Sequence, residues 1–588
     1  MAVVPGPLPQ NSRSSLPTSH RPTLRSGVRC SATEPRWNSQ HQDQGQHPLP
    51  GSPQRGLLGS VGLPSFLNGG ARRPQQQLNL VSHKLIAENV SELANLAKVQ
   101  AETSRAAEAT MPKISVAMAA LQAELAKHRD AAASSELGKP MAVPLRVPVF
   151  DIPDPSGTSR RRPGAAGVGP DGTGEEILLQ GFNWESHKHD WYAVLSGQAA
   201  DIAEAGFTLV WMPPPTDSVS PEGYLPRDLY SLNSNYGSLD SLRSCIKALQ
   251  GHGIKVLGDA VLNHRCAHFQ DSNGVWNKFG GKMDWDARAI VSDDPHFHGK
   301  GHVSTGDAFH AAPNIDHSQE FVRADISEWL QWLRQDIGFD GWRLDYVRGF
   351  HGRFVGEYME SSAPFFAVGE YWDSLAYDSA GVPEHNQNGH RQRIVNWINA
   401  AGGKATAFDV TTKGILHAVF QRNEYWRLRD HDGKPPGVMG WWPSRATTFL
   451  ENHDTGSTQG HWRFPENGLE QGYAYILTHP GTPTVFYDHF FQDGLQGTLK
   501  ELMALRKRNR LSSRSSIHIH HADKDVYAAE VDERLVLKLG PGDWSPNHNL
   551  KAASAAKGKW VRVAQGRDWC AWEAESPPSL TTPHHHHK

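Results

Sequence analysis

Residues 338–345 read GFDGWRLD, a short apolar run that ends in a carboxylate. Two later stretches repeat the form, VGEYW at 368–372 and FLENHD at 449–454. Each run is typical of a buried strand that presents an acidic side chain at its carboxyl end. A parallel barrel builds its site from side chains at the ends of several strands. The three stretches therefore predict a barrel with a carboxylate-lined site.

Strand-like runs of this kind recur along the chain, with helix-length segments between them. Eight such runs predict an α/β fold, a (β/α)8 TIM barrel over residues 176–514. Residues 265–318 break the pattern because they are rich in Gly and Asp and show no clear helix. They predict a small domain inserted in the third βα loop. The eight runs are 177–181, 208–212, 255–260, 341–344, 366–369, 406–409, 447–450 and 484–487.

The two ends of the chain differ from this body in pattern. Residues 515–575 show alternation of apolar and polar positions at 525–530, 534–539, 560–563 and 570–573, which predicts a C-terminal antiparallel β-domain. Residues 576–588 form a tail. Residues 78–130 place apolar residues at helical spacing. They predict a helical N-terminal extension, a hairpin or coiled coil that offers a surface for self-association. Residues 131–175 are expected to be a linker and 31–77 to be disordered.

The composition of the chain indicates which binding partners and which cellular compartment to expect. The chain has 588 residues and a net charge of −3, with no large basic block and no apolar run near the roughly 20 residues of a membrane helix. Nucleic acid and membrane are therefore not expected as partners. Residues 1–30 are rich in Ser, Pro and Arg and lack both an acid before residue 30 and an apolar core. This profile predicts an organelle transit peptide, and VRCSA at 28–32 resembles a plastid processing site, so a plastid location is expected, with a cytoplasmic location as the alternative.

The residues beside two of these acids predict different roles for them. Asp345 follows Arg343 by two residues, so both side chains point to the same side of a strand. The guanidinium is expected to depress the pKa of Asp345 and keep it ionised as a nucleophile. Glu370 stands beside Tyr371 and Trp372, where poor solvation is expected to raise its pKa and keep the proton of a general acid. Such a pair is what cleavage of a glycosidic bond requires.

A lone acid at a strand end is more often a helix cap or a partner in a loop salt bridge, but several acids in this order favour a catalytic site. Beyond the acids, residues 176–573 resemble the α-amylase family of glycoside hydrolases, and specifically the plant-type α-amylases. The resemblance extends through long stretches without catalytic residues. These are LQGFNWES at 179–186, VWMPPP at 210–215, GVMGWWP at 437–443 and GYAYILTHPG at 472–481.

The resemblance implies roles for single residues. Asp345 would be the nucleophile, Glu370 the acid/base and Asp454 the transition-state stabiliser of a retaining mechanism, whereas Asp259 would be structural. An adjacent tryptophan pair matches a surface platform for starch, with a buried core pair as the alternative reading. Arg348 replaces a lysine of the family, so contacts on the leaving side of the substrate are expected to shift. The implied substrate-binding residues are Tyr224, His264, Arg343, Arg348, His453, Trp441 and Trp442.

The resemblance also concerns calcium, which in relatives ties the inserted domain to the barrel. Asn263 and the carbonyl of Gly349 remain at the matching positions, but Ser304 and Asn314 stand where plant-type members carry Asp. Calcium affinity depends on how many oxygen ligands are charged. A weak or absent calcium site at Asn263, Asn314 and Gly349 is therefore expected, with Asp307 as a carboxylate that would restore one charge.

The function that the sequence favours is retaining endo-hydrolysis of internal α-1,4-glucosidic bonds in starch, glycogen and related α-glucans. The segment APNID at 312–316 resembles the plant amylase version and favours α-1,4 over α-1,6 bonds. One alternative is an α-glucan transglycosylase or α-1,6-acting relative on the same fold. The other is a catalytically impaired starch-binding protein, against which the intact acids argue.

Overall fold

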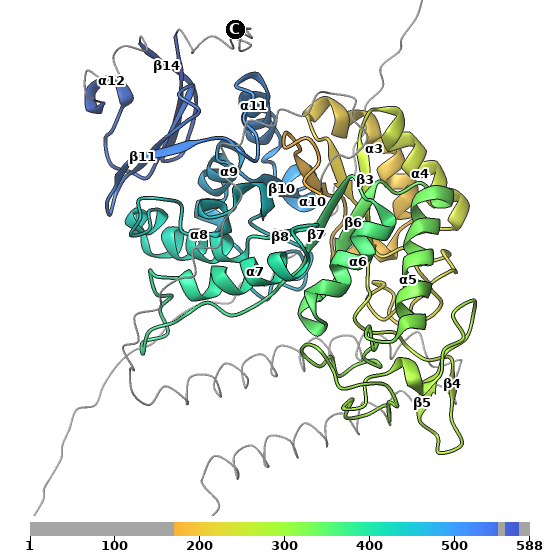
Figure 1. Ribbon diagram of the computed structural model, residues 1–588. Helices are drawn as coiled ribbons and strands as arrows, with labels where there is room; N and C mark the ends of the chain where they lie inside the picture. Colours follow the sequence, from red (N-terminus) through yellow and green to blue (C-terminus); the bar gives the residue numbers. More distant parts are fainter. Residues whose placement is uncertain (1–169, 551–558, 576–588) are drawn as a thin grey trace, which may run out of the picture. The chain divides into compact units, whose positions relative to one another are not determined.

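The computed structural model describes residues 170–550 and 559–575 (Figure 1). The predictions for 1–30, 31–77, 78–130 and the tail after 575 lie outside these residues, as does nearly all of the predicted linker. Within the described part, eight strands form a closed barrel in the order β1-β10-β9-β8-β7-β6-β3-β2. Every neighbouring pair is parallel. The predicted (β/α)8 fold is confirmed.

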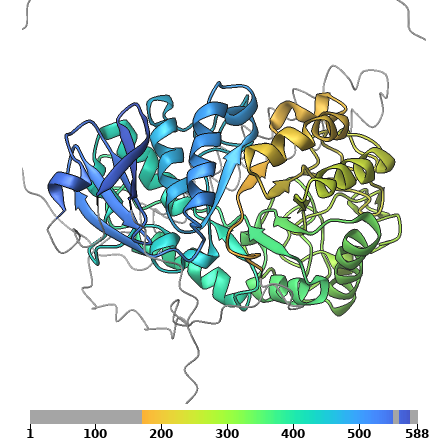
Figure 2. The same cartoon turned by 90° about the horizontal axis from the view of Figure 1, so that it is seen from above.

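The barrel strands coincide with the eight predicted runs. Helices follow the strands along the chain and lie outside them, as the view from above shows (Figure 2). The strands are β1 (Leu178–Gln180), β2 (Leu209–Trp211), β3 (Lys255–Ala260), β6 (Gly341–Leu344), β7 (Phe366–Gly369), β8 (Thr406–Phe408), β9 (Ala446–Thr448) and β10 (Thr482–Phe486). The main helices are α3 (Trp191–Ala205), α4 (Leu239–Gly251), α5 (Glu320–Trp332), α6 (Gly352–Ser362), α7 (Asn388–Ala400), α8 (Val410–Arg422), α9 (Leu469–Thr478), α10 (Tyr487–Phe491) and α11 (Gln496–Arg508).

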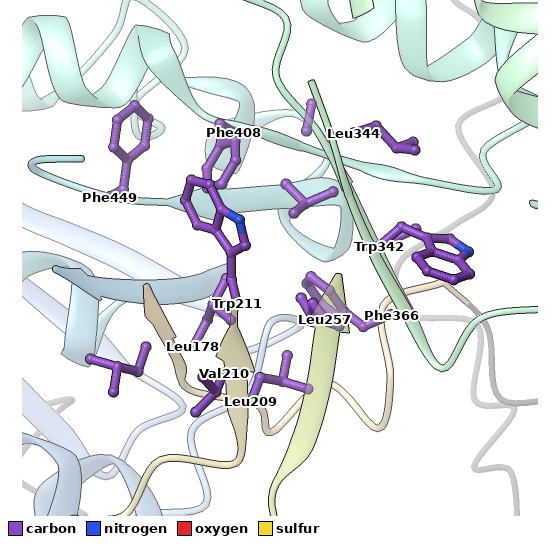
Figure 3. Packing of buried hydrophobic residues seen from close by; sticks show 14 of the residues in the cluster. Leu178, Leu209, Val210, Trp211, Leu257, Trp342, Leu344, Phe366, Phe408 and Phe449 are labelled. Atoms are coloured by element: carbon purple, nitrogen blue, oxygen red, sulfur yellow. The ribbon is translucent and has the colours of Figure 1, made fainter. Parts of the chain in front are cut away.

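The strands form because nearly every residue in them can be buried. Both faces of a barrel strand are covered, so most residues of these strands are apolar, and the threonines of β9 and β10 are buried as well. Leu178, Leu209, Leu257 and Trp342 have no exposed surface and pack together in the core (Figure 3). This packing makes the strand ends a rigid frame for the polar side chains that follow them.

Strands β3, β6 and β7 are neighbours, and this order determines the site. Asp259 is in register with Arg343, and Arg343 is in register with Val368. A Cβ atom on Gly341 would lie 2.0 Å from the carbonyl oxygen of Phe366, so glycine is needed where β6 meets β7. The residues that end these strands consequently emerge side by side.

The third βα connection carries the insertion that the sequence predicts. Between β3 and α5 the chain forms long loops, a short helical turn and the two-stranded hairpin of β4 (Phe269–Gln270) and β5 (Trp276–Lys278). Arg265 is buried in this segment and donates to the carbonyl oxygens of Met283 and Gly280 at 2.7 and 2.8 Å. Backbone carbonyls bonded to a buried guanidinium thus stabilise a segment with little regular structure.

The C-terminal sheet is antiparallel, as predicted, in the order β11-β12-β13-β15-β14. It contacts α9 through a hydrogen bond of 2.8 Å between His479 and the hydroxyl of Tyr527. The sequence did not predict β11. The strands are β11 (Ile517–Ala522), β12 (Tyr527–Val531), β13 (Leu535–Leu539), β14 (Trp560–Gly566) and β15 (Trp569–Ala574), with the short helix α12 (Pro546–Asn549) before β14.

Three of the four cysteines lie within the described residues. Cys245, Cys266 and Cys570 are free thiols. Among the helices of residues 170–550 and 559–575, none combines the length and apolar character needed to cross a membrane.

Candidate active site

Arg343 is the centre of the polar cluster at the carboxyl ends of the strands. Its side chain is 1% exposed, and its guanidinium binds three carboxyl groups. Nη1 lies 2.9 Å from Asp259 and 2.7 Å from Asp345, and Nη2 lies 2.7 Å from Glu370. The predicted shared direction of Arg343 and Asp345 is confirmed. One cation thereby brings together acids from three neighbouring strands.

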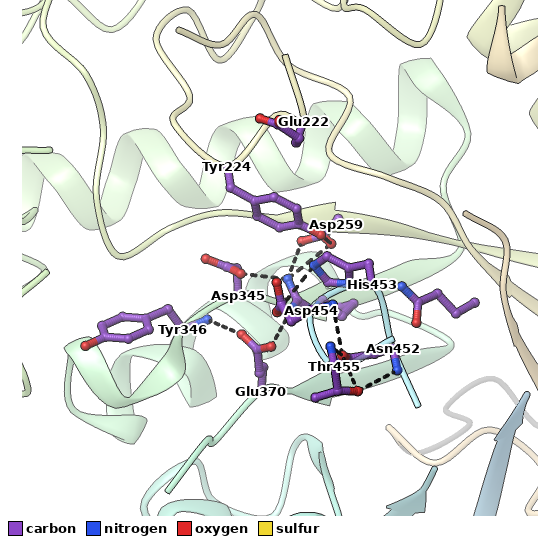
Figure 4. Close-up of polar contacts among 12 residues, drawn as sticks. Glu222, Tyr224, Asp259, Asp345, Tyr346, Glu370, Asn452, His453, Asp454 and Thr455 are labelled. Carbon is purple, nitrogen blue, oxygen red and sulfur yellow. Dashed lines mark hydrogen bonds and ion pairs between the residues drawn. The ribbon is translucent and has the colours of Figure 1, made fainter. Parts of the chain in front are cut away.

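Asp259 is the inner member of this cluster. Its carboxylate has no exposed surface and accepts hydrogen bonds from Trp211 Nε1 at 3.0 Å and from the Tyr224 hydroxyl at 2.9 Å (Figure 4). Burial raises the pKa of Asp259 to about 6, although Arg343 opposes the shift. By accepting from both side chains, Asp259 orients Arg343 and Tyr224.

Glu370 follows the last residue of β7 and is oriented from two sides. Arg343 binds one carboxyl oxygen, and the backbone N–H of Tyr346 donates to the other at 3.2 Å (Figure 4). Tyr346 has a left-handed backbone with φ 43°, uncommon for a residue with a side chain. The turn after Asp345 therefore orients the second acid as well.

Asp454 lies nearer to solvent than the other acids. Its side chain is 44% exposed, compared with 10% for Asp345 and for Glu370. Its carboxylate lies 3.6 Å from Nε2 of His453, whose buried ring stacks on Tyr224 with centroids 5.0 Å apart. The structure therefore assembles all three predicted acids at one end of the barrel.

The pKa values differ from the sequence-based expectation for one acid. Burial raises the pKa of Glu370 to about 8, as predicted. Burial also raises the pKa of Asp345, to about 7. The prediction that this pKa lies below its usual value is therefore wrong. Arg343 does lower both values, but its charge is shared among three carboxyls, and Asp259 repels the Asp345 carboxylate. The raised pKa of Glu370 suits a proton donor.

Two of the other predicted substrate-binding residues have protein partners in the site. His264 is buried, with Nε2 2.8 Å from the carbonyl oxygen of Tyr224 and Nδ1 3.2 Å from the Asn263 amide. Burial lowers its pKa to about 4, consistent with a neutral ring. Arg348 forms ion pairs with Asp307 and Asp373. Their sugar-binding roles stay predictions.

The tryptophan pair lies away from the acids. Trp441 and Trp442 precede β9, on the side of the barrel where strands begin, whereas the acids follow strand ends. Both rings are half-buried, and the guanidinium of Arg391 lies 3.7 Å from the ring of Trp441. The pair is therefore not a buried core pair, and the starch platform stays a prediction.

Sequence reasoning missed two side chains that line the cluster. The ring of Trp184 is nearly parallel to those of Tyr224 and His453, with centroids 6.4 and 6.1 Å away. Gln180 Nε2 lies 2.9 Å from Nδ1 of His453 and orients that ring. Both lie at the end of β1, inside the stretch LQGFNWES, whose position after the first strand was the available signal.

The donors expected for calcium do not suit that ion. Asn263 and Gly349 lie together, since a Cβ on Gly349 would be 1.8 Å from Oδ1 of Asn263. Asn314, however, accepts from the backbone N–H of Phe309 at 2.7 Å and donates to Asp294 at 2.8 Å. Its amide therefore presents a donor where Ca²⁺ needs oxygen. The Ser304 hydroxyl donates to Asp293 at 2.7 Å, and the described residues contain no group of three or more His, Cys, Asp or Glu able to hold a metal.

Fold and site together define a class of protein, the (β/α)8 barrels with a cluster of carboxyl groups at the carboxyl ends of their strands. Comparison with known families narrows the class. The family described as "Alpha amylase, catalytic domain" matches residues 197–364, and "Alpha-amylase C-terminal beta-sheet domain" matches residues 508–573.

Individual relatives agree with these matches. "Alpha-amylase 3, chloroplastic" of Arabidopsis thaliana is 60% identical over 403 residues, 68% of this chain and 44% of the relative. The chain thus spans less than half of that relative's length. "Probable alpha-amylase 2" of Arabidopsis thaliana is 47% identical over 402 residues, 68% of this chain and 94% of the relative. "Glucan 1,4-alpha-maltotetraohydrolase" of Stutzerimonas stutzeri is 31% identical over 424 residues, which cover 66% of this chain and 73% of the relative. The chain belongs to the α-amylase family of glycoside hydrolases.

The raised pKa of Asp345 predicts a stability cost. Its pKa in the folded chain, about 7, lies above its usual value of 3.8. The folded state therefore binds this proton more tightly than the unfolded state, and the resulting stability is lost as pH rises through about 7. We expect Asp345→Asn to be more stable than the parent chain, by a margin that grows between about pH 4 and pH 7. Thermal unfolding of both proteins across this range measures the margin.

Glu360→Gln is the control, because Lys404 lowers the pKa of this exposed carboxyl. That variant should show no gain in stability with rising pH. A constant difference between Asp345→Asn and the parent chain would contradict the assigned pKa.

Proposed function

We propose that the protein is an α-amylase that hydrolyses internal α-1,4 bonds of starch, glycogen and related α-glucans with retention of configuration. One observation carries the proposal: Arg343 binds both Asp345 and Glu370 at 2.7 Å. A shared guanidinium keeps the two carboxyls close together. Retaining glycosidases need about 5–5.5 Å between them, whereas inverting enzymes need about 6.5–9.5 Å.

In the first step Glu370 donates its proton to the glycosidic oxygen while an oxygen of Asp345 attacks the anomeric carbon. The C–O bond to the leaving sugar breaks, and a glycosyl ester forms on Asp345. Because burial raises the pKa of Glu370 to about 8, this group is protonated at neutral pH. Asp345 attacks in its ionised form, which the guanidinium of Arg343 beside it favours.

In the second step Glu370 accepts a proton from water, which attacks the anomeric carbon and releases Asp345. Two inversions leave the configuration unchanged. The positive charge that develops on the sugar in each transition state is stabilised by Asp454. The parallel rings of Tyr224 and His453 suit stacking beneath the sugar, and Arg343 maintains the spacing of the acids.

The substrate class is supported by the relatives, whose names specify α-amylase and 1,4-α-glucan hydrolysis. Residues 312–316, the segment that favours α-1,4 bonds, are buried in the loop before α5. The intact cluster of Asp345, Glu370 and Asp454 argues against an impaired starch-binding protein. Product sizing separates hydrolysis from transglycosylation, because a transglycosylase also yields products longer than its substrate.

Two substitutions test the assignment. We expect Glu370→Gln to lower kcat on soluble starch by about 10²–10⁴ and Asp345→Asn to lower it by more than about 10⁴. An aryl maltooligosaccharide with an acidic phenol should restore the first step to Glu370→Gln, since that leaving group needs no proton. The same substrate should not restore the first step to Asp345→Asn. Reducing-sugar release and phenol release measure the two effects.

The control is Glu328→Gln, which removes an exposed carboxyl from an ion pair on α5 and should retain full activity. Circular dichroism establishes that each variant is folded. Turnover like that of the parent chain in Asp345→Asn, with contaminating amylase excluded, would overturn the proposal.

We also propose a plastid location. Residues 1–30 carry the composition of a transit peptide, and one Arabidopsis relative is named chloroplastic. A fluorescent fusion of residues 1–60 is expected to enter plastids in leaf cells. The control replaces Arg13, Arg21, Arg25 and Arg29 with Glu and should remain outside. Cytosolic or secreted fluorescence of the unmodified fusion would reject the location without affecting the enzymatic assignment.

A further inference from the structure

The loop at residues 304–309 of the insertion lies against the turn that follows Asp345. The backbone N–H of Asp307 donates to the carbonyl oxygen of Arg348 at 2.9 Å, and that of His351 donates to the Thr305 hydroxyl at 3.0 Å. A Cβ atom on Gly306 would lie 2.3 Å from the same Arg348 carbonyl. Contact between the two segments is therefore direct and close.

Arg348 connects this loop to both catalytic turns. It lies three residues after Asp345, and its Nη2 lies 2.5 Å from a carboxylate oxygen of Asp307. Nη1 donates at 2.8 Å to Asp373, three residues after Glu370, and at 2.8 Å to the carbonyl of Trp372. The Arg348 side chain is only 16% exposed, and both of its terminal nitrogens are already bonded to protein groups.

The charges in this network balance. Arg348 lies between the carboxylates of Asp307 and Asp373, and Asp373 also pairs with Arg393. Two cations thus face two carboxylates, with Asp373 only 13% and Asp307 40% exposed. Partly buried pairs of this kind are screened less by solvent than surface pairs.

The network also extends to the catalytic acid. The ring of Tyr346 packs edge-on against Phe309, with centroids 5.6 Å apart, and its backbone N–H donates to Glu370. Displacement of the loop at 304–309 would therefore move the amide that orients Glu370.

We infer that the ion-pair bridge Asp307–Arg348–Asp373 performs the fastening role for which the donors at Asn263, Asn314 and Gly349 are unsuited. It joins the insertion to the turns after Asp345 and Glu370 without a metal ion. Arg348 is then a positioning residue and does not bind the leaving part of the substrate. Asp307 is its partner in the bridge and does not serve as a calcium ligand.

Asp307→Asn, Arg348→Lys and the double variant test the bridge by thermal unfolding, in a chelator and in millimolar calcium. Each single variant is expected to lower Tm by about 2–4 °C. The double variant should lower it by no more than the larger single effect, because both changes break one interaction. Calcium should leave the Tm of the parent chain within about 1 °C of its value in chelator. Glu360→Gln, which removes an exposed carboxyl of an ion pair, is the matched control and should not change Tm.

Ser304→Asp combined with Asn314→Asp serves as the positive control for calcium, since it restores two carboxylates. Calcium should raise the Tm of that variant. A calcium-dependent gain of more than about 5 °C in the parent chain, or strictly additive losses in the double variant, would overturn the inference.

Starch kinetics distinguish a positioning role of Arg348 from a role in substrate binding. Unlike the Tm measurements, they rest on the proposed function. A positioning role predicts that Asp307→Asn and Arg348→Lys both lower kcat, by up to about tenfold, with KM within about twofold. A raised KM in Arg348→Lys, with kcat unchanged and Asp307→Asn unaffected, would instead show that Arg348 binds substrate. If the parent chain fails to hydrolyse starch, the proposed function fails, while the Tm measurements still test the bridge.

Discussion

The arrangement of the site depends on one buried cation shared by three carboxyl groups. A guanidinium with 1% exposure could not remain buried without compensating charge, and the carboxyls of Asp259, Asp345 and Glu370 could not gather without it. Because Arg343 lies on β6 between β3 and β7, the pairing also requires this strand order. The insertion between β3 and β6 must therefore leave the barrel and return without separating the two strands.

The same interaction influences the protonation of the three carboxyls. Three carboxyls around one guanidinium leave an excess of negative charge, so the cluster retains protons at a pH where exposed acids have lost them. Burial raises the pKa of both Glu370 and Asp345, and Arg343 opposes the rise at each of them. The cluster is costly in free energy of folding, and the apolar strands beneath it supply the rigidity that keeps it assembled.

Much of this could be predicted from the sequence, because each acid ends a local apolar run. The barrel, the insertion and the convergence of Asp345, Glu370 and Asp454 follow from such runs and their order. The pKa of Asp345 could not be predicted from its neighbour Arg343 alone, since Asp259 and Glu370 reach the same cation from other strands. Strand β11 was missed because its alternation is short: it covers Ile517 to His520 and is broken by His521, next to the register shift between Ile519 and His521. The pairing of Asp307 with Arg348 could not be predicted either, because it depends on a long-range contact between the insertion and the turn after β6.

The central claim is that Arg343 places Asp345 to form a covalent bond with the sugar. It is tested most directly by mass spectrometry of the Glu370→Gln protein after reaction with an α-maltooligosyl fluoride. Fluoride leaves without a proton donor, and the missing base slows hydrolysis of the ester, so the intermediate should accumulate. We expect a glycosyl adduct on the peptide that contains Asp345. An adduct on another carboxyl, or a product of inverted configuration without an adduct, would contradict it.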